Sequence, residues 1–208
     1  MTAPGRNGDR DPTRQSKPET RDVAPGTGTL KATVTWLECT EPPRRLPALP
    51  VNVHATLLRV NRIPLHFYRY LYWRIGRKWH WVYRLRMKDA ELSAIVHDEK
   101  TEIRVLSIDG APAGMFELHR TDDATMSLVY FGLMEQARGR GLGKWFLGQA
   151  MMAAWNHPIT RLTVSTNTLD HPAALPLYQK MGFSPFSQSE ALIRPLTNKE
   201  LLGIMQAD

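Results

Sequence analysis

A short glycine-rich run carries the clearest chemistry in this sequence, because its residue types suit the binding of an anion. The run is Gln136-Ala137-Arg138-Gly139-Arg140-Gly141-Leu142-Gly143, between an apolar, strand-like segment and a segment with helical periodicity. A strand that passes through glycines into a helix N-terminus presents free backbone N–H groups and the positive end of the helix dipole. Lys144 and the two arginines add positive charge. The run therefore predicts an anion site.

Two common nucleotide-binding motifs do not fit this run. A Walker loop places Ser or Thr after its Gly-Lys pair, but Gly143-Lys144 is followed by Trp145. A dinucleotide fingerprint that begins at Gly139 would need a third glycine where Lys144 stands. The run does fit the pattern Q/R-x-x-G-x-G/A, through Gln136, Gly139 and Gly141.

A second motif follows downstream, in the run His171-Pro172-Ala173-Ala174-Leu175-Pro176-Leu177-Tyr178-Gln179-Lys180-Met181-Gly182-Phe183. Together, this run and the glycine run resemble two motifs of the GNAT superfamily of acyl-CoA-dependent N-acyltransferases. The downstream run also resembles that of an uncharacterised bacterial-type subgroup. The resemblance covers about residues 100–195. The run is similar to the superfamily pattern N-x-x-A-x-x-L-Y-x-K-x-G-F at Ala174, Leu177, Tyr178, Lys180, Gly182 and Phe183.

The resemblance implies acetyl-CoA as co-substrate, without a metal. Backbone groups near Phe131, Leu133 and Met134 would contact the thioester and the pantetheine arm. The residues implied for the pyrophosphate are Gln136, Arg138, Gly139, Arg140, Gly141, Leu142, Gly143 and Lys144. His171 stands where the family often has Asn, and Asn167 is the candidate replacement.

Acetyl transfer to an amine requires a group that protonates the departing thiolate and a group that accepts the amine proton. Tyr178 matches the tyrosine that often serves as the general acid in the family. Alternatively, Tyr178 is an aromatic residue that only packs the helix on the sheet. Glu117 is the best candidate base if its face of the strand looks into the cleft, and otherwise it is a solvated strand residue. His119 and Glu135 are the runners-up.

Hydrophobic periodicity predicts the elements that position these residues. A turn at Asp109-Gly110, in a loop that extends around Pro112, would join two strands in a hairpin. The order of elements indicates a mixed α/β sheet with helices on its faces, and the resemblance implies a GNAT-like, mostly antiparallel sheet. The expected strands span 33–38, 51–60, 102–108, 114–119, 126–134, 161–166 and 189–194, the helices 64–75, 88–97, 141–155 and 172–181, and an extended segment 79–85.

Composition and charge set wider limits. The chain has 208 residues with 27 basic and 20 acidic side chains, a formal net charge of +7 and one cysteine, Cys39. A single cysteine excludes an internal disulfide framework and a cysteine-rich zinc site. Residues 1–30 combine charges and prolines, which predicts a disordered tail before a single domain, 31–208. With no long apolar run and no signal-like N-terminus, we expect a cytoplasmic protein that does not enter membranes.

Residues 59–88 carry nine basic side chains interleaved with aromatic ones and no acidic residue. This pattern suits an acidic small molecule or nucleic acid, and it also fits a packed helix with solvated arginines. The resemblance implies that this aromatic segment lines part of the acceptor cleft. The favoured function is N-acetyl transfer from acetyl-CoA to a primary amine of a small molecule or protein, by direct attack in a ternary complex. An inactive acyl-CoA sensor and an RNA- or ribosome-associated acetyltransferase are the alternatives. Nucleic acid is not the favoured partner, and a homodimer is compatible with the sequence.

Overall fold

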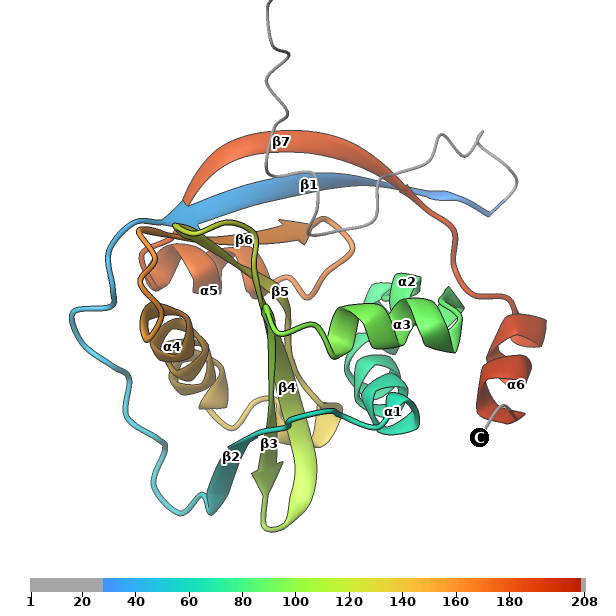
Figure 1. The fold of residues 1–208 in the computed structure, drawn as a ribbon, viewed down its shortest axis with the longest axis horizontal. Coiled ribbons are helices and arrows are strands. Elements are labelled where there is room, and N and C mark those ends of the chain that lie inside the picture. Colours follow the sequence, from blue (N-terminus) through green and yellow to red (C-terminus); the bar gives the residue numbers. More distant parts are fainter. Residues whose placement is uncertain (1–27, 207–208) are drawn as a thin grey trace, which may run out of the picture.

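The computed structural model describes residues 28–206, so almost all of the predicted tail 1–30 lies outside the described residues. An open seven-stranded sheet forms the centre of the molecule (Figure 1). Its strands are β1 (Leu30–Cys39), β2 (Ala55–Arg59), β3 (Thr101–Ile108), β4 (Ala111–Arg120), β5 (Thr125–Leu133), β6 (Arg161–Asn167) and β7 (Ser184–Ile193). The helices are α1 (Leu65–Gly76), η2 (Arg77–Trp79), α2 (Tyr83–Arg86), α3 (Asp89–Val96), η3 (Glu135–Ala137), α4 (Leu142–Trp155), α5 (Ala174–Lys180) and α6 (Asn198–Gln206).

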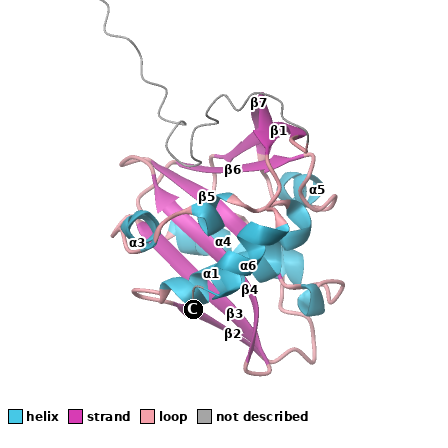
Figure 2. Cartoon of the chain, turned by 90° about the vertical axis from the view of Figure 1, so that its right-hand side faces the viewer, coloured by secondary structure: helices cyan, strands magenta, loops and turns pink. Residues whose placement is uncertain are grey.

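The strands follow the order β2-β3-β4-β5-β6-β1-β7. Within the described chain, β5 and β6 pair in parallel, and every other neighbouring pair is antiparallel. The predicted mixed, mostly antiparallel sheet is therefore confirmed. Strand β1 lies between β6 and β7, so the first described element is an interior strand of the sheet. Figure 2 shows these three strands gathered at one end, away from β2 and β3.

Helices cover both faces of the sheet, as predicted (Figure 1). On one face α4 packs through Phe146, Leu147 and Met151 on buried residues of β4, β5 and β6. On the other face α1 packs through Tyr68 and Leu71 in a second core, which also includes residues of α2 and α3. Burial of these apolar stripes is the main favourable contribution to folding, at about 25 cal/mol per Å².

The predicted long elements match the structure within a few residues, and three features differ. Residues 79–85 are not extended: η2 ends at Trp79 and α2 begins at Tyr83. The prediction was wrong because Trp81 packs directly on Gly76, where an added Cβ would lie 2.2 Å from the ring. The hairpin between β3 and β4 turns at Asp109-Gly110, as predicted, and both residues have positive φ. Pro112 lies within β4 and not in the loop where it was expected. Helix α6 was not predicted.

Ion pairs of Glu200 hold α6 against α2. Its carboxylate accepts hydrogen bonds from Arg86 at 2.9 Å and from Arg194 at 2.9 Å. The hydrogen bond from Arg86 is the largest cause that lowers the pKa of Glu200, from its usual value of 4.5 to about 2. A carboxylate with a lowered pKa stabilises the folded state above its unfolded pKa, and this contribution disappears as the pH falls.

We therefore expect Glu200→Gln to lower the free energy of unfolding by about 1 kcal/mol at pH 7, since a quarter of the side chain remains exposed to screening solvent. The difference from the wild-type chain shrinks as the pH falls from 4.5 toward 2. Urea unfolding at pH 7 and at pH 3.5 measures both values. An equal loss at both pH values would contradict the ionic origin of the effect.

Candidate active site

The two parallel strands separate partway along their length. Strand β5 pairs with β6 from Thr125 to Leu128. Beyond this point β5 contains a β-bulge. Leu118 of β4 pairs with Leu128 and Glu117 pairs with Tyr130, so Val129 is an extra residue without a partner in β4. A bulge of this kind bends the strand and increases its twist. The described part of β5 beyond Leu128 has no pairing with β6, so its backbone groups on that edge are open to a ligand.

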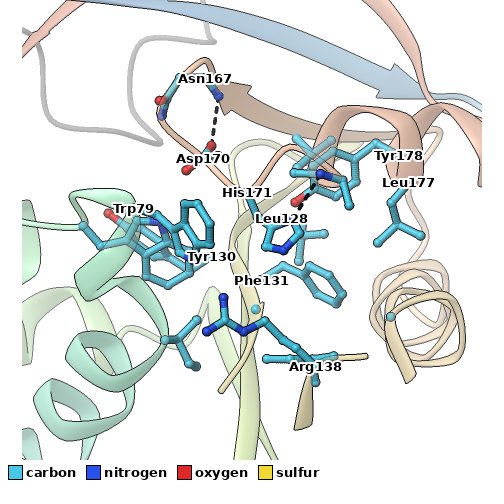
Figure 3. A pocket seen from close by; sticks show the side chains of 18 of the residues that line it. Trp79, Leu128, Tyr130, Phe131, Arg138, Asn167, Asp170, His171, Leu177 and Tyr178 are labelled. Atoms are coloured by element: carbon cyan, nitrogen blue, oxygen red, sulfur yellow. Dashed lines mark hydrogen bonds between the residues drawn. The ribbon is translucent and has the colours of Figure 1, made fainter. Parts of the chain in front are cut away.

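A cavity of about 470 Å³ occupies this gap. Its wall comes from β5 and β6, the first turn of α4, the residues before and within α5, and the segment from α1 to α2. Figure 3 shows Trp79 and Tyr130 on one side and Leu177 and Tyr178 on the other, with Arg138 between them at the glycine loop. The fold thus brings both sequence motifs and the aromatic segment to one cavity.

Most residues predicted to contact the cofactor line this cavity: Phe131, Leu133, Arg138, Gly139, Gly141, Leu142, Gly143, Lys144, Asn167 and His171. Three others are not among its lining residues. Met134 is buried, and its N–H donates to the carbonyl of Ala113 at 2.8 Å. Gln136 donates through Nε2 to the carbonyl of Pro112 at 3.1 Å, and the side chain of Arg140 is exposed.

The glycine loop has a backbone that suits an anion. Gly139 and Gly141 both have φ of 74°, in the left-handed region, and α4 begins at Leu142. An added Cβ on Gly139 would meet nothing within 4 Å, so backbone conformation rather than space favours glycine there. Alternating left-handed residues turn successive N–H groups toward a common point and form an anion-binding concavity. The first turn of α4 adds its free N–H groups and its dipole.

Trp79 joins the two motifs across the cavity. Its ring lies 4.9 Å from the ring of His171 and 5.8 Å from the guanidinium of Arg138. His171 also accepts a hydrogen bond from the N–H of Ala173 at 3.1 Å, through Nδ1. The resemblance implied that the aromatic segment lines part of the acceptor cleft, but no motif singled out Trp79 among its several aromatic residues.

Tyr178 lines the cavity and also packs in the core. Only 5% of it is exposed, and its ring lies 6.4 Å from that of Phe131 and 5.9 Å from that of Phe183. Burial, followed by the negative charge of Asp170, raises the pKa of the Tyr178 phenol. The phenol is therefore protonated at neutral pH. Both interpretations of this residue, packing and proton donation, are compatible with its position.

Glu117 is fully buried, with 0% exposed, and is not among the residues that line the cavity. One carboxylate oxygen accepts a hydrogen bond from Arg84 at 2.7 Å, and the other accepts one from the Tyr68 hydroxyl at 2.5 Å. Arg84 is 5% exposed, and its guanidinium lies 5.4 Å from the ring centre of Tyr130. Tyr130 does line the cavity, so Glu117 lies behind the cavity wall.

The runner-up bases lie outside the cavity lining as well. Glu135 accepts hydrogen bonds from Lys78 at 2.6 Å and from Arg77 at 3.3 Å, and the bond from Lys78 lowers its pKa most. His119 bonds to Thr101 at 3.0 Å, and burial lowers its pKa.

Internal ion pairs use much of the basic segment 59–88. Its carboxylate partners come from outside the segment, which is why the sequence showed basic residues without acids. Six basic side chains have a carboxylate within 4 Å, in the pairs Arg59–Glu102, Arg69–Asp89, Arg77–Glu135, Lys78–Glu135, Arg84–Glu117 and Arg86–Glu200. These pairs reduce the charge that the segment offers to nucleic acid.

Comparison with known proteins identifies the family of the chain. Residues 65–183 match the acetyltransferase (GNAT) family, and this match covers more than half of the chain. The chain belongs to this family. A search of curated proteins found no significant match.

Solved structures share the fold. An IAA acetyltransferase from Bacillus cereus is 24% identical, with a TM-score of 0.50 over 64% of this chain and 79% of that chain. A putative GNAT acetyltransferase from Novosphingobium aromaticivorans is 17% identical, with a TM-score of 0.54 over 86% and 73%. A tandem GNAT protein from the clavulanic acid biosynthesis pathway is 16% identical, with a TM-score of 0.55 over 88% and 63%. The chain thus spans less than two thirds of the length of some structures that it matches.

Two further features of residues 28–206 concern metals and membranes. In this range no group of three or more His, Cys, Asp or Glu side chains is arranged to hold a metal ion. None of the helices described there has the length and apolar character needed to cross a membrane.

Proposed function

We propose that this protein transfers the acetyl group of acetyl-CoA to a primary amine, by direct attack in a ternary complex. The observation that carries the proposal is the cavity in the gap between β5 and β6. It joins the glycine loop at one end to the aromatic segment at the other. A ligand with an anionic end and a long, neutral arm suits such a cavity, and acetyl-CoA has both.

In the proposed complex the pyrophosphate lies at the N-terminus of α4, against Gly139, Gly141 and the side chains of Arg138 and Lys144. The pantetheine arm lies along the open edge of β5, where backbone N–H and C=O groups replace the missing strand pairing. The thioester then lies near Phe131 and Tyr178. Backbone N–H groups of β5 stabilise the negative charge that develops on the thioester oxygen.

The amine nitrogen attacks the thioester carbonyl carbon, and the C–S bond breaks with its electron pair on sulfur. Tyr178 donates its phenolic proton to the departing thiolate. We propose Glu117 as the final acceptor of the amine proton, acting through water, because its enclosed carboxylate excludes direct contact with the acceptor. The hydrogen bonds of Glu117 to Arg84 and Tyr68 also make it a buried structural support of the cavity wall.

A matched pair of loop variants tests the cofactor site. Asn and Asp both tolerate the left-handed backbone of Gly139, and the space around its Cβ position is open. We expect Gly139→Asp to weaken coenzyme A binding about tenfold more than Gly139→Asn, because one negative charge near the pyrophosphate costs on the order of 1–4 kcal/mol. Titration calorimetry with coenzyme A measures the difference. Equal affinities would place the pyrophosphate elsewhere.

Release of free thiol from acetyl-CoA in the presence of a panel of primary amines tests the reaction, with mass spectrometry of the acetylated product. Thiol release that depends on both substrates supports the proposal. Coenzyme A binding without turnover across the whole panel would favour the acyl-CoA sensor. The internal ion pairs of the basic segment favour a small-molecule acceptor over RNA.

A further inference from the structure

Three aromatic rings form one wall of the cavity, on the side opposite Tyr178. Tyr72 comes from α1, Trp81 from the segment after η2, and Tyr130 from β5. Their ring centres lie 5.2 Å apart for Tyr72 and Trp81, 4.9 Å for Tyr72 and Tyr130, and 5.0 Å for Trp81 and Tyr130. We call these three residues the aromatic wall. All three line the cavity, and Tyr130 appears facing it in Figure 3. Since 0% of Tyr72 and 5% of Tyr130 are exposed, the half-buried Trp81 supplies most of the accessible ring surface, with the two tyrosines packed behind it.

The polar atoms of the aromatic wall are largely engaged within it. The Tyr72 hydroxyl donates to the Tyr130 hydroxyl at 3.3 Å. Burial raises the pKa of both phenols, so neither carries a charge at neutral pH. What the aromatic wall offers a ligand is therefore ring surface rather than an ionised partner.

Close packing holds the aromatic wall in place. A Cβ on Gly76 would lie 2.2 Å from Cγ of Trp81, so the indole rests directly on the backbone of α1. A Cβ on Gly132 would lie 2.3 Å from Cγ2 of Ile75, so the end of α1 rests directly on β5. A wall that is ordered before the ligand arrives loses little conformational freedom on binding.

The cavity offers few partners to a polycationic acceptor. Arg138 and Lys144 are assigned to the pyrophosphate, and Asp170 is the one acidic side chain among the described lining residues. The Asp170 carboxylate already accepts hydrogen bonds from Thr166 at 2.9 Å and from the N–H of Asn167 at 2.9 Å. The guanidinium of Arg84 lies behind the Tyr130 ring and already uses its attraction for a cation.

We propose that the acceptor is an aromatic amine, an arylamine or an arylalkylamine, whose ring stacks on the aromatic wall and directs its amino group toward the thioester. This inference rests on the proposed acetyl transfer and names the class of its acceptor. The ring occupies the side of the cavity formed by Trp81 and Tyr130. The nitrogen then faces the side of Phe131 and Tyr178, where the acetyl group is transferred.

Binding to the protein saturated with coenzyme A tests the inference without relying on turnover. The probes are 2-phenylethylamine, 2-cyclohexylethylamine, which has a similar shape without a π system, and spermidine. Aromatic pairs contribute about 0.5–1.5 kcal/mol beyond the area that they bury. We therefore expect the phenyl compound to bind about 2- to 12-fold more tightly than the cyclohexyl compound, and spermidine to bind most weakly. Equal binding of the two ring compounds, or tightest binding of spermidine, would overturn the inference.

Variants connect this preference to the aromatic wall. Trp81→Leu removes most of the difference between the two ring compounds, whereas Trp81→Phe retains a ring and keeps part of it. Tyr70→Leu is the matched control, since Tyr70 is on the same helix as Tyr72 but is 46% exposed and outside the cavity. A preference that survives in folded Trp81→Leu would refute this placement of the ring.

Turnover separates failure of the inference from failure of the proposed function. Selective binding of 2-phenylethylamine without thiol release from acetyl-CoA would leave the binding class in place and refute acetyl transfer to it. Thiol release with equal kcat/KM for the phenyl, cyclohexyl and aliphatic amines would support acetyl transfer and refute the aromatic acceptor.

Discussion

Replacing Glu117 with alanine is expected to lower the free energy of unfolding by about 3–5 kcal/mol, the cost of removing one partner of a buried ion pair. Arg84 would keep its charge with 5% of its surface exposed and no carboxylate beside it. Burial by itself lowers the pKa of the Arg84 guanidinium. The negative charge of Glu117 is the largest of the opposing effects, which together raise this pKa above its usual value. The Tyr68 hydroxyl would lose its acceptor as well. Urea unfolding at pH 7 measures the loss.

Glu190→Ala is the matched control, because its pair with Lys31 is two-thirds exposed and is worth at most about 1 kcal/mol. A double variant, Glu117→Leu with Arg84→Met, removes both charges and recovers much of the stability, whereas a double variant as unstable as Glu117→Ala would assign the loss to packing. Glu117→Gln then separates support from proton transfer. If Glu117 is the base, the rate of acetyl transfer by the Glu117→Gln variant falls at pH 7 and recovers at high pH. A pH profile equal to that of the wild-type chain would remove Glu117 as the base.

Tyr178→Phe is expected to lower kcat about 100-fold, the lower end of the usual contribution of a general acid. The phenylalanine ring keeps the contacts with Phe131 and Phe183, so the fold and the KM for acetyl-CoA change little. The phenol of the wild-type chain has a raised pKa and stays protonated through the neutral range, so it is available as a donor. Steady-state kinetics with the best amine of the panel measures the loss.

Tyr70→Phe is the control for the Tyr178 experiment, because it removes a hydroxyl from an exposed position outside the cavity. If kcat of Tyr178→Phe stays within twofold of the wild-type value, the residue serves packing and not proton donation. A large rise in the KM for acetyl-CoA, with kcat unchanged, would instead indicate a contact with the bound cofactor.

The glycine loop and α4 were predictable from local sequence because their requirements are local. Gly139 and Gly141 adopt a left-handed backbone that glycine reaches without a steric cost, and an apolar stripe with helical period follows them at once. The helix that carries Tyr178 was predictable for the same reason. The family, and the proposed position of an anion at α4, therefore follow from residues in two short runs of the chain.

The other half of the site depends on contacts between distant residues, which carry no local signal. Arg84 was one basic residue among nine, and only the packing of α2 on the sheet makes it the partner of Glu117, 33 positions along the chain. The bulge at Val129 depends on the register between β4 and β5, and the gap that it opens depends on where β6 ends its pairing. Segment 79–85 looked extended because alternation does not show that Trp81 packs on Gly76.

Local sequence was thus sufficient to predict an anion-binding loop and to recognise the resemblance to the family, in which a tyrosine lies near that loop. The exclusion of Glu117 from the cavity, the aromatic wall and the insertion of β1 between β6 and β7 came from the folded arrangement. The physical reason is that burial and pairing are properties of neighbours in space. An ion pair, a ring contact or a strand register forms only when folding brings together segments that the sequence keeps apart.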